Sequence, residues 1–135
     1  MSETQKGNVI FVDDDKFLAD LYGTKFSAAG YNVQSCLSVD TALAALKSGF
    51  AADAIIFDLT MPERDGFSFL EELARSHLAP NAARIALTNQ SDDAEKARAE
   101  ALGTHRYIVK ATMIPSEVVA VVGEEIGKRK TSPAA

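Results

Sequence analysis

Acidic side chains, a threonine and a lysine occupy positions in the sequence where they could form one reactive site. The aspartates at 13–15 directly follow one short apolar run, and Asp58 directly follows another. Thr88 directly follows a third apolar run, and Lys110 directly follows a fourth. Two carboxylates about 4 Å apart repel by roughly 4 kcal/mol at an effective dielectric constant of about 20. Such a group takes up a proton or binds a cation, and its oxygen ligands favour Mg²⁺.

Carboxylates, a bound metal ion, a lysine and a hydroxyl group together suit phosphoryl transfer. The metal ion and the ammonium group balance the charge on the phosphoryl oxygens, and one carboxylate can act as the nucleophile. Taken singly, each aspartate is better explained as a polar loop or turn residue. Their common position after apolar runs favours a site.

The elements that must position these side chains alternate along the chain. Apolar runs predict five strands, at residues 8–12, 31–36, 54–57, 84–87 and 106–109. Helical spacing follows each run, at residues 16–29, 39–48, 67–77, 91–102 and from Pro115 onward. This alternation predicts an α/β fold with a parallel sheet and helices on both faces. Ligands of such sheets bind beyond the carboxyl ends of the strands, where the reactive side chains would meet.

Composition and charge limit the class of protein. The chain has 135 residues, which fits one domain, and we expect it at residues 8–128 between tails at 1–7 and 129–135. The net charge of −5 argues against binding to nucleic acid. The single cysteine, Cys36, suggests no oxidising compartment, and no apolar stretch is long enough to span a membrane. We therefore expect a cytoplasmic location without membrane insertion.

Four motifs resemble those of response-regulator receiver domains, the phosphoacceptor modules of two-component signalling. They are VDDD at 12–15, FDLTMPERDG at 57–66, ALT at 86–88 and YIVK at 107–110. Their order and spacing agree with the family over nearly the whole chain. The resemblance implies a flavodoxin-like, doubly wound sheet of five strands with five helices. It also implies phosphorylation of an aspartate in the presence of Mg²⁺.

The resemblance also implies a role for each matching residue. Asp58 would be the phosphoacceptor, and Asp13, Asp14, Asp58 and the backbone carbonyl of Thr60 would bind Mg²⁺. Lys110 would pair with the phosphoryl group, and Thr88 would hydrogen-bond it and shift towards it. Tyr107 would rotate inward as part of the switch.

Two positions depart from the family pattern. Asn89 stands where a small residue usually follows the threonine, and we expect it to tune the lifetime of the phosphorylated form. Ala111 stands where a proline usually follows the lysine, often through a cis bond. Because a cis bond without proline costs about 2.5–4 kcal/mol, we predict a trans bond between Lys110 and Ala111.

The function that this pattern favours is a stand-alone receiver rather than an enzyme in the classical sense. It would accept a phosphoryl group from a histidine kinase or a histidine phosphotransfer protein, then signal to a downstream protein or relay the group. One alternative is a phosphatase of the haloacid dehalogenase type with Asp13 as nucleophile. Another is a degenerate receiver that acts by protein contact alone.

The pattern of apolar residues in the helix expected at 16–29 indicates a docking surface for the phosphodonor. At 100° per residue, a core stripe holds Leu18, Tyr22, Phe26 and Ala29. Phe17 and Leu21 lie 80° or more from its centre, so we expect both to be at least half exposed. An exposed apolar pair one turn apart suits a partner helix.

Overall fold

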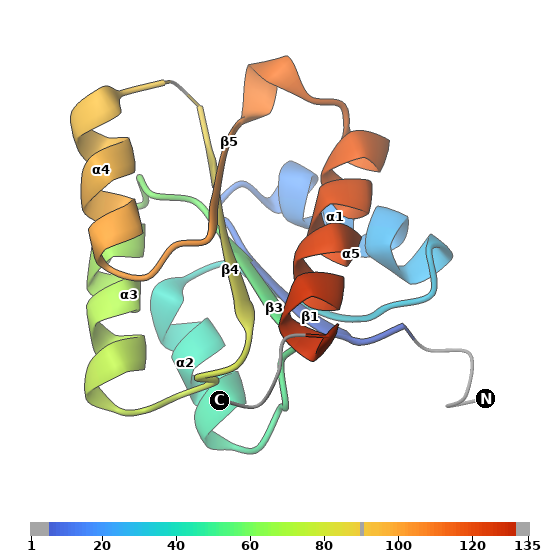
Figure 1. The fold of residues 1–135 in the computed structure, drawn as a ribbon, viewed down its shortest axis with the longest axis horizontal. Coiled ribbons are helices and arrows are strands. Elements are labelled where there is room, and N and C mark those ends of the chain that lie inside the picture. The colour runs from blue at the N-terminus through green and yellow to red at the C-terminus, as the bar shows by residue number, and fades with distance from the viewer. Residues whose placement is uncertain (1–5, 90, 132–135) are drawn as a thin grey trace.

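The computed structural model describes residues 6–89 and 91–131. Strands and helices alternate along this part of the chain, and a short 3₁₀ turn, η2, precedes the last helix (Figure 1). The elements are β1 (Asn8–Val12), α1 (Lys16–Ala28), β2 (Asn32–Cys36), α2 (Val39–Lys47), β3 (Ala54–Phe57), α3 (Gly66–Arg75), β4 (Ala83–Thr88), α4 (Asp93–Ala101), β5 (Arg106–Val109), η2 (Lys110–Thr112) and α5 (Pro115–Thr131).

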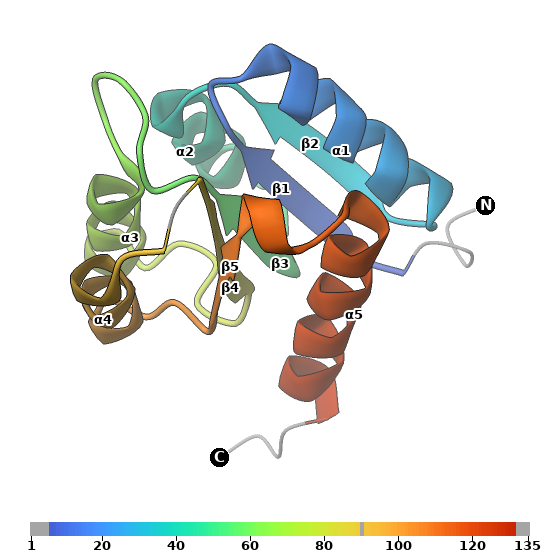
Figure 2. The ribbon, with the colours of Figure 1, turned by 90° about the horizontal axis from the view of Figure 1, so that it is seen from above.

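The five strands form one parallel sheet in the order β2-β1-β3-β4-β5, which confirms the predicted flavodoxin-like fold. Side chains along each strand alternate between two apolar layers. In β1, Ile10 and Val12 pack with α2, α3 and α4, whereas Val9 and Phe11 pack with α1 and α5. Figure 2 shows these two groups of helices on opposite sides of the sheet. Both faces of the sheet are covered, which explains why the strands lack polar alternation.

The helices begin where side chains cap them. The side-chain oxygens of Asp15, Ser38, Asp65 and Asp92 each accept a hydrogen bond from a backbone N–H in the first turn of α1, α2, α3 and α4. The third aspartate of the VDDD motif is therefore a helix cap. This leaves Asp13 and Asp14 as the pair that faces the site.

The last helix differs from the sequence prediction. The sequence predicts a tail after Lys128, whereas α5 continues to Thr131. Two basic side chains, Lys128 and Arg129, lie in its last turns, where the helix dipole favours positive charge. Lys128 also lies 3.2 Å from Glu125, a buried carboxylate of the preceding turn. The dipole and this contact favour continuing the helix. No helix in the described ranges combines the length and apolar character that crossing a bilayer requires.

Candidate functional site

The register of the central strands places two aspartates side by side. Val12 pairs with Phe57, and the N–H of Asp58 donates to the carbonyl of Val12 at 3.0 Å. The next residue of each strand, Asp13 on β1 and Asp58 on β3, therefore lies at the same edge of the sheet. Both are almost fully buried, with 1% and 3% of their surface exposed, whereas Asp14 is exposed.

The three carboxylates form one compact group. Asp13, Asp14 and Asp58 can each offer an oxygen such that all three oxygens lie within 4.8 Å of one another. Backbone N–H groups orient the two buried members: Asp15 donates to Asp13 Oδ1 at 2.9 Å, and Thr60 donates to Asp58 Oδ1 at 3.1 Å. An all-oxygen set with one open side fits Mg²⁺, which keeps several waters when bound to protein carboxylates. The donor chemistry therefore agrees with the predicted metal.

Lys110 contacts the two buried carboxylates although it lies far from both in the sequence. It begins the 3₁₀ turn after β5, and its bond to Ala111 is trans, as predicted. Its Nζ lies 2.8 Å from Asp13 Oδ2 and 3.3 Å from Asp58 Oδ2. The 3₁₀ turn thus brings the lysine into the site without a cis bond.

Burial and charge act against each other on the ionisable groups of the site. Burial raises the pKa of the Asp58 carboxyl, as does the nearby charge of Asp13, while the Thr60 N–H and the Lys110 ammonium lower it. The first two effects prevail, and the pKa lies above its ordinary value. Burial lowers the pKa of Lys110, but its hydrogen bond to Asp13 and the charges of both carboxylates raise it above the ordinary value. Lys110 is therefore the positive partner of these carboxylates.

Three further predicted residues lie on β4 and β5 or just beyond them. Thr88 ends β4, is buried, and pairs in register with Val109, the residue before Lys110. Asn89 follows it and is exposed. Tyr107 on β5 is partly buried and packs against the layer formed by α2, α3 and α4, and burial raises the pKa of its hydroxyl group. The sheet thus brings Thr88 and Lys110 to the same edge as the aspartates.

The loop after Asp58 is closely fitted. The N–H of Gly66 donates to the carbonyl of Leu59 at 3.1 Å, which closes the loop on itself. A β-carbon at Gly66 would lie 2.6 Å from the carbonyl oxygen of Asp58, so this position requires glycine. Glu63 has a φ of 68°, in the left-handed region that side-chain-bearing residues rarely adopt. Sequence reasoning missed Arg64, whose side chain holds this loop, because its partners are not adjacent in sequence.

The exposed apolar pair predicted on α1 is only half correct. Phe17 is 74% exposed, as expected, but Leu21 is mostly covered. Helical side chains lean towards the N-terminus, so Leu21 lies over the turn that carries Phe17 and Leu18. The buried stripe of α1 also differs from the predicted one. Ala19 is buried, whereas Leu18 and Ala29 are only partly buried. A prediction from the angle of each residue around the helix axis does not include this covering of one side chain by those of the preceding turn.

Comparison with known proteins identifies the class. The profile described as the response regulator receiver domain matches residues 9–122. The chain belongs to this family, whose members are signalling domains rather than classical enzymes. This finding favours the receiver over the haloacid dehalogenase alternative.

Individual relatives agree with the family. The regulatory protein VanRc of Enterococcus gallinarum is 31% identical over 118 residues, which cover 87% of this chain and 49% of VanRc. The response regulator SaeR of Staphylococcus aureus is 28% identical over 123 residues, or 91% of this chain and 52% of SaeR. The chain therefore spans about half the length of these curated relatives.

Solved structures show the same architecture. A CheY-like receiver domain protein from Methanospirillum hungatei JF-1 has a TM-score of 0.83 at 21% identity, with 92% of this chain and 96% of that chain covered. A putative response regulator from Chloroflexus aurantiacus J-10-fl has a TM-score of 0.80 at 26% identity, covering 90% and 98%. The fold and the family thus agree over nearly the whole described domain.

Proposed function

We propose that this receiver domain accepts a phosphoryl group on Asp58 in the presence of Mg²⁺. The observation that carries the proposal is the arrangement around this carboxylate. Asp58 is nearly buried, has Asp13 and Asp14 within metal-binding reach, and lies 3.3 Å from a lysine ammonium group. A complete set of this kind also speaks against a degenerate receiver that works by contact alone.

The transfer step follows from these residues. A carboxylate oxygen of Asp58 attacks the phosphorus of a phosphohistidine on the donor protein, and a new P–O bond forms. The P–N bond breaks, and its electron pair returns to the imidazole nitrogen of the donor. The product is an acyl phosphate on Asp58. When bound by Asp13, Asp14, Asp58 and the carbonyl of Thr60, Mg²⁺ supplies positive charge that offsets repulsion between the carboxylates and the incoming phosphoryl oxygens.

Lys110, Thr88 and Tyr107 then convert phosphorylation into a change of shape. The Lys110 ammonium, which pairs with Asp13 at 2.8 Å, moves to a phosphoryl oxygen. The Thr88 hydroxyl donates to another phosphoryl oxygen, which draws the end of β4 towards Asp58. Tyr107, only partly buried, turns inward into the space that this movement opens. The altered surface then acts on a downstream protein, or the phosphoryl group is relayed.

The donor is a histidine kinase or a histidine phosphotransfer protein, and we propose that it docks beside α1. Phe17 is 74% exposed at the start of this helix, close in sequence to Asp13 and Asp14. Ile114, 61% exposed, follows the turn that carries Lys110. Two large exposed apolar side chains, one at the start of α1 and one in the segment before α5, lie at the edge that holds the carboxylates and suit contact with an apolar helix face of the donor.

The test is phosphorylation by a small phosphodonor, measured by intact mass. We expect the wild-type protein with Mg²⁺ to gain one phosphoryl group, and Asp58→Asn to gain none. An Asp13→Asn protein should keep Asp58 as its only phosphorylation site, though modified slowly, and peptide mapping distinguishes the two positions. Labelling of Asp58→Asn, or undiminished labelling in excess chelator, would contradict the proposal.

A further inference from the structure

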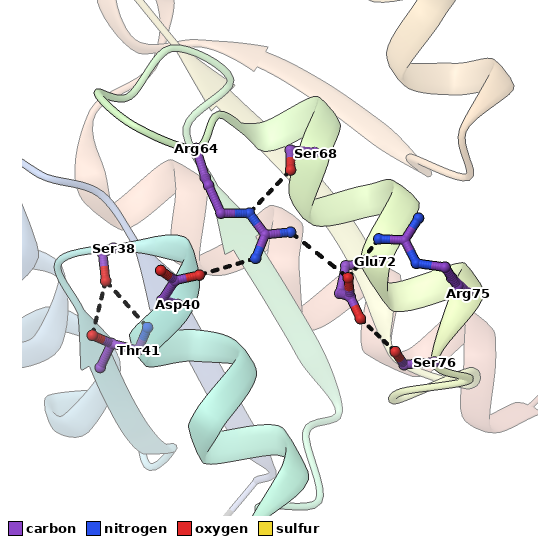
Figure 3. A network of polar contacts seen from close by, with 8 residues as sticks. All are labelled: Ser38, Asp40, Thr41, Arg64, Ser68, Glu72, Arg75 and Ser76. Atoms are coloured by element: carbon purple, nitrogen blue, oxygen red, sulfur yellow. Dashed lines mark hydrogen bonds and ion pairs between the residues drawn. The ribbon is translucent and has the colours of Figure 1, made fainter.

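Arg64 connects the loop after the phosphoacceptor to two helices. Its Nε donates to Ser68 Oγ at 3.1 Å, and its Nη1 donates to Asp40 Oδ1 at 2.9 Å (Figure 3). Its Nη2 lies 3.8 Å from Glu72 Oε1. Asp40 belongs to the first turn of α2, whereas Ser68 and Glu72 belong to α3. One guanidinium group therefore joins the loop to both helices.

Glu72, one of the two partners of Arg64 on α3, is itself held by neighbouring side chains. Glu72 is hydrogen-bonded by Ser76 and by Arg75, which lowers the pKa of its carboxyl to about 2. Glu72 therefore stays ionised at neutral pH. The side chain of Arg64 is only 32% exposed. An isolated surface ion pair, such as that with the 75% exposed Asp40, contributes little by itself, but a planar guanidinium that contacts three acceptors at once specifies a geometry as well.

The loop that Arg64 holds is under local strain. Glu63, the preceding residue, has a φ of 68°, and the N–H of Arg64 donates to the carbonyl of Pro62 at 2.8 Å. Such backbone conformations are unfavourable and persist where the surroundings impose them. The same loop contains Thr60, whose N–H orients Asp58. A loop released at Arg64 would relax from a position close to the metal-binding residues.

We propose that Arg64 is a positioning residue that holds the β3–α3 loop in the shape required to bind Mg²⁺. It does so through Asp40, Ser68 and Glu72, none of which belongs to the carboxylate cluster. This inference rests on the proposed function, since it assumes that Asp13, Asp14, Asp58 and Thr60 bind the metal. It adds α2 as a support of the site, through a contact between residues that are 24 positions apart.

The test measures the affinity of the unphosphorylated protein for Mg²⁺ by isothermal titration calorimetry at fixed pH and ionic strength. The variants are Arg64→Ala and Asp40→Asn, the second of which removes the charge of one partner of Arg64 without changing any residue of the loop. The matched control is Arg75→Ala, because Arg75 also pairs with Glu72 but lies at the end of α3, outside the loop. Thermal unfolding of each variant, without metal, separates positioning from general stability.

We expect Arg64→Ala to weaken Mg²⁺ binding by about threefold to tenfold, below the range of about 10–100-fold reported for groups that directly orient a metal ligand. Asp40→Asn should weaken it less, and Arg75→Ala, which is linked to Arg64 only through Glu72, should weaken it least of all. Arg64→Lys should recover part of the loss, because a single ammonium group replaces only one of the contacts. Wild-type affinity in Arg64→Ala, or an equal loss in Arg75→Ala, would overturn this inference alone. Absence of Mg²⁺ binding in the wild-type protein would overturn the proposed function as well.

Discussion

Replacing Gly66 by alanine should disturb both folding and phosphorylation. A β-carbon there would lie 2.6 Å from the carbonyl oxygen of Asp58 and 2.9 Å from the Cα of Leu59. Ordinary van der Waals contact begins near 3.4 Å, so the two backbone segments must separate by roughly 0.8 Å (3.4 − 2.6 Å). Both obstructing atoms belong to the backbone, so no side-chain rotation can relieve the contact. The displaced segment carries the phosphoacceptor.

The size of the effect follows from two opposing contributions. Forcing extra atoms into a packed region costs about 1–3 kcal/mol, and backbone obstruction places Gly66→Ala in the upper half of that range. Alanine recovers at most about 1 kcal/mol of helix propensity. We therefore expect the free energy of unfolding to fall by about 1–2 kcal/mol. Phosphorylation should slow by about tenfold or more, because a misplacement of about 1 Å can cost up to a hundredfold in rate.

Urea denaturation and the rate of phosphorylation by a small donor measure these two effects. Gly127→Ala is the matched control, since it makes the same substitution in a helix where a β-carbon meets nothing within 4 Å. We expect this control to keep the wild-type rate and to gain about 0.5–1 kcal/mol of stability. Wild-type stability and rate in Gly66→Ala, or an equal loss in the control, would refute the reasoning.

Three further predictions concern the mouth of the site, the docking surface and the core. Asn89→Ala should change the lifetime of the phosphorylated form several-fold, because the Asn89 amide can hydrogen-bond a phosphoryl oxygen or an attacking water; unchanged decay would exclude this role. Phe17→Ala should slow transfer from a protein donor while a small donor still reacts normally, and Leu21→Ala should do so less because Leu21 is mostly covered. Equal loss with both donors would mean that these residues support the fold instead. The Cys36 thiol is 1% exposed, and burial raises its pKa to about 11. It should therefore resist a disulfide reagent at pH 8 until urea unfolds the protein, and rapid labelling of the native protein would contradict this.

The order of elements and the central site could be predicted because short-range signals determine them. Apolar runs such as the one before Asp58 have no polar alternation, which indicates strands covered on both sides. Parallel strands share one carboxyl edge, so Asp13, Asp58 and Lys110, which follow three of the strands, are expected at that edge. Pairing of β1 with β3 sets Asp13 beside Asp58, and the 3₁₀ turn after β5 brings Lys110 within hydrogen-bonding distance of both.

Features that depend on neighbouring side chains could not be predicted in the same way. The covering of Leu21 depends on how side chains lean along α1, which an angular plot does not include. The role of Arg64 depends on the strained path of the loop and on Asp40, which lies on a different helix. No local pattern distinguishes this arginine from one exposed to solvent. The continuation of α5 to Thr131 likewise depends in part on the contact of Lys128 with Glu125, whose burial the sequence does not show.

The parallel sheet also determines how this domain can be tethered. Every strand runs towards the edge that holds the carboxylates, and α5 returns in the opposite direction (Figures 1 and 2). The start of β1 and the end of α5 therefore both lie at the other edge, about 16 Å away for a five-residue strand at about 3.3 Å per residue. A dye, a sensor surface or a fused protein joined at either place would leave the approach to Asp58 open. Immobilised protein should thus accept phosphoryl groups as readily as protein free in solution.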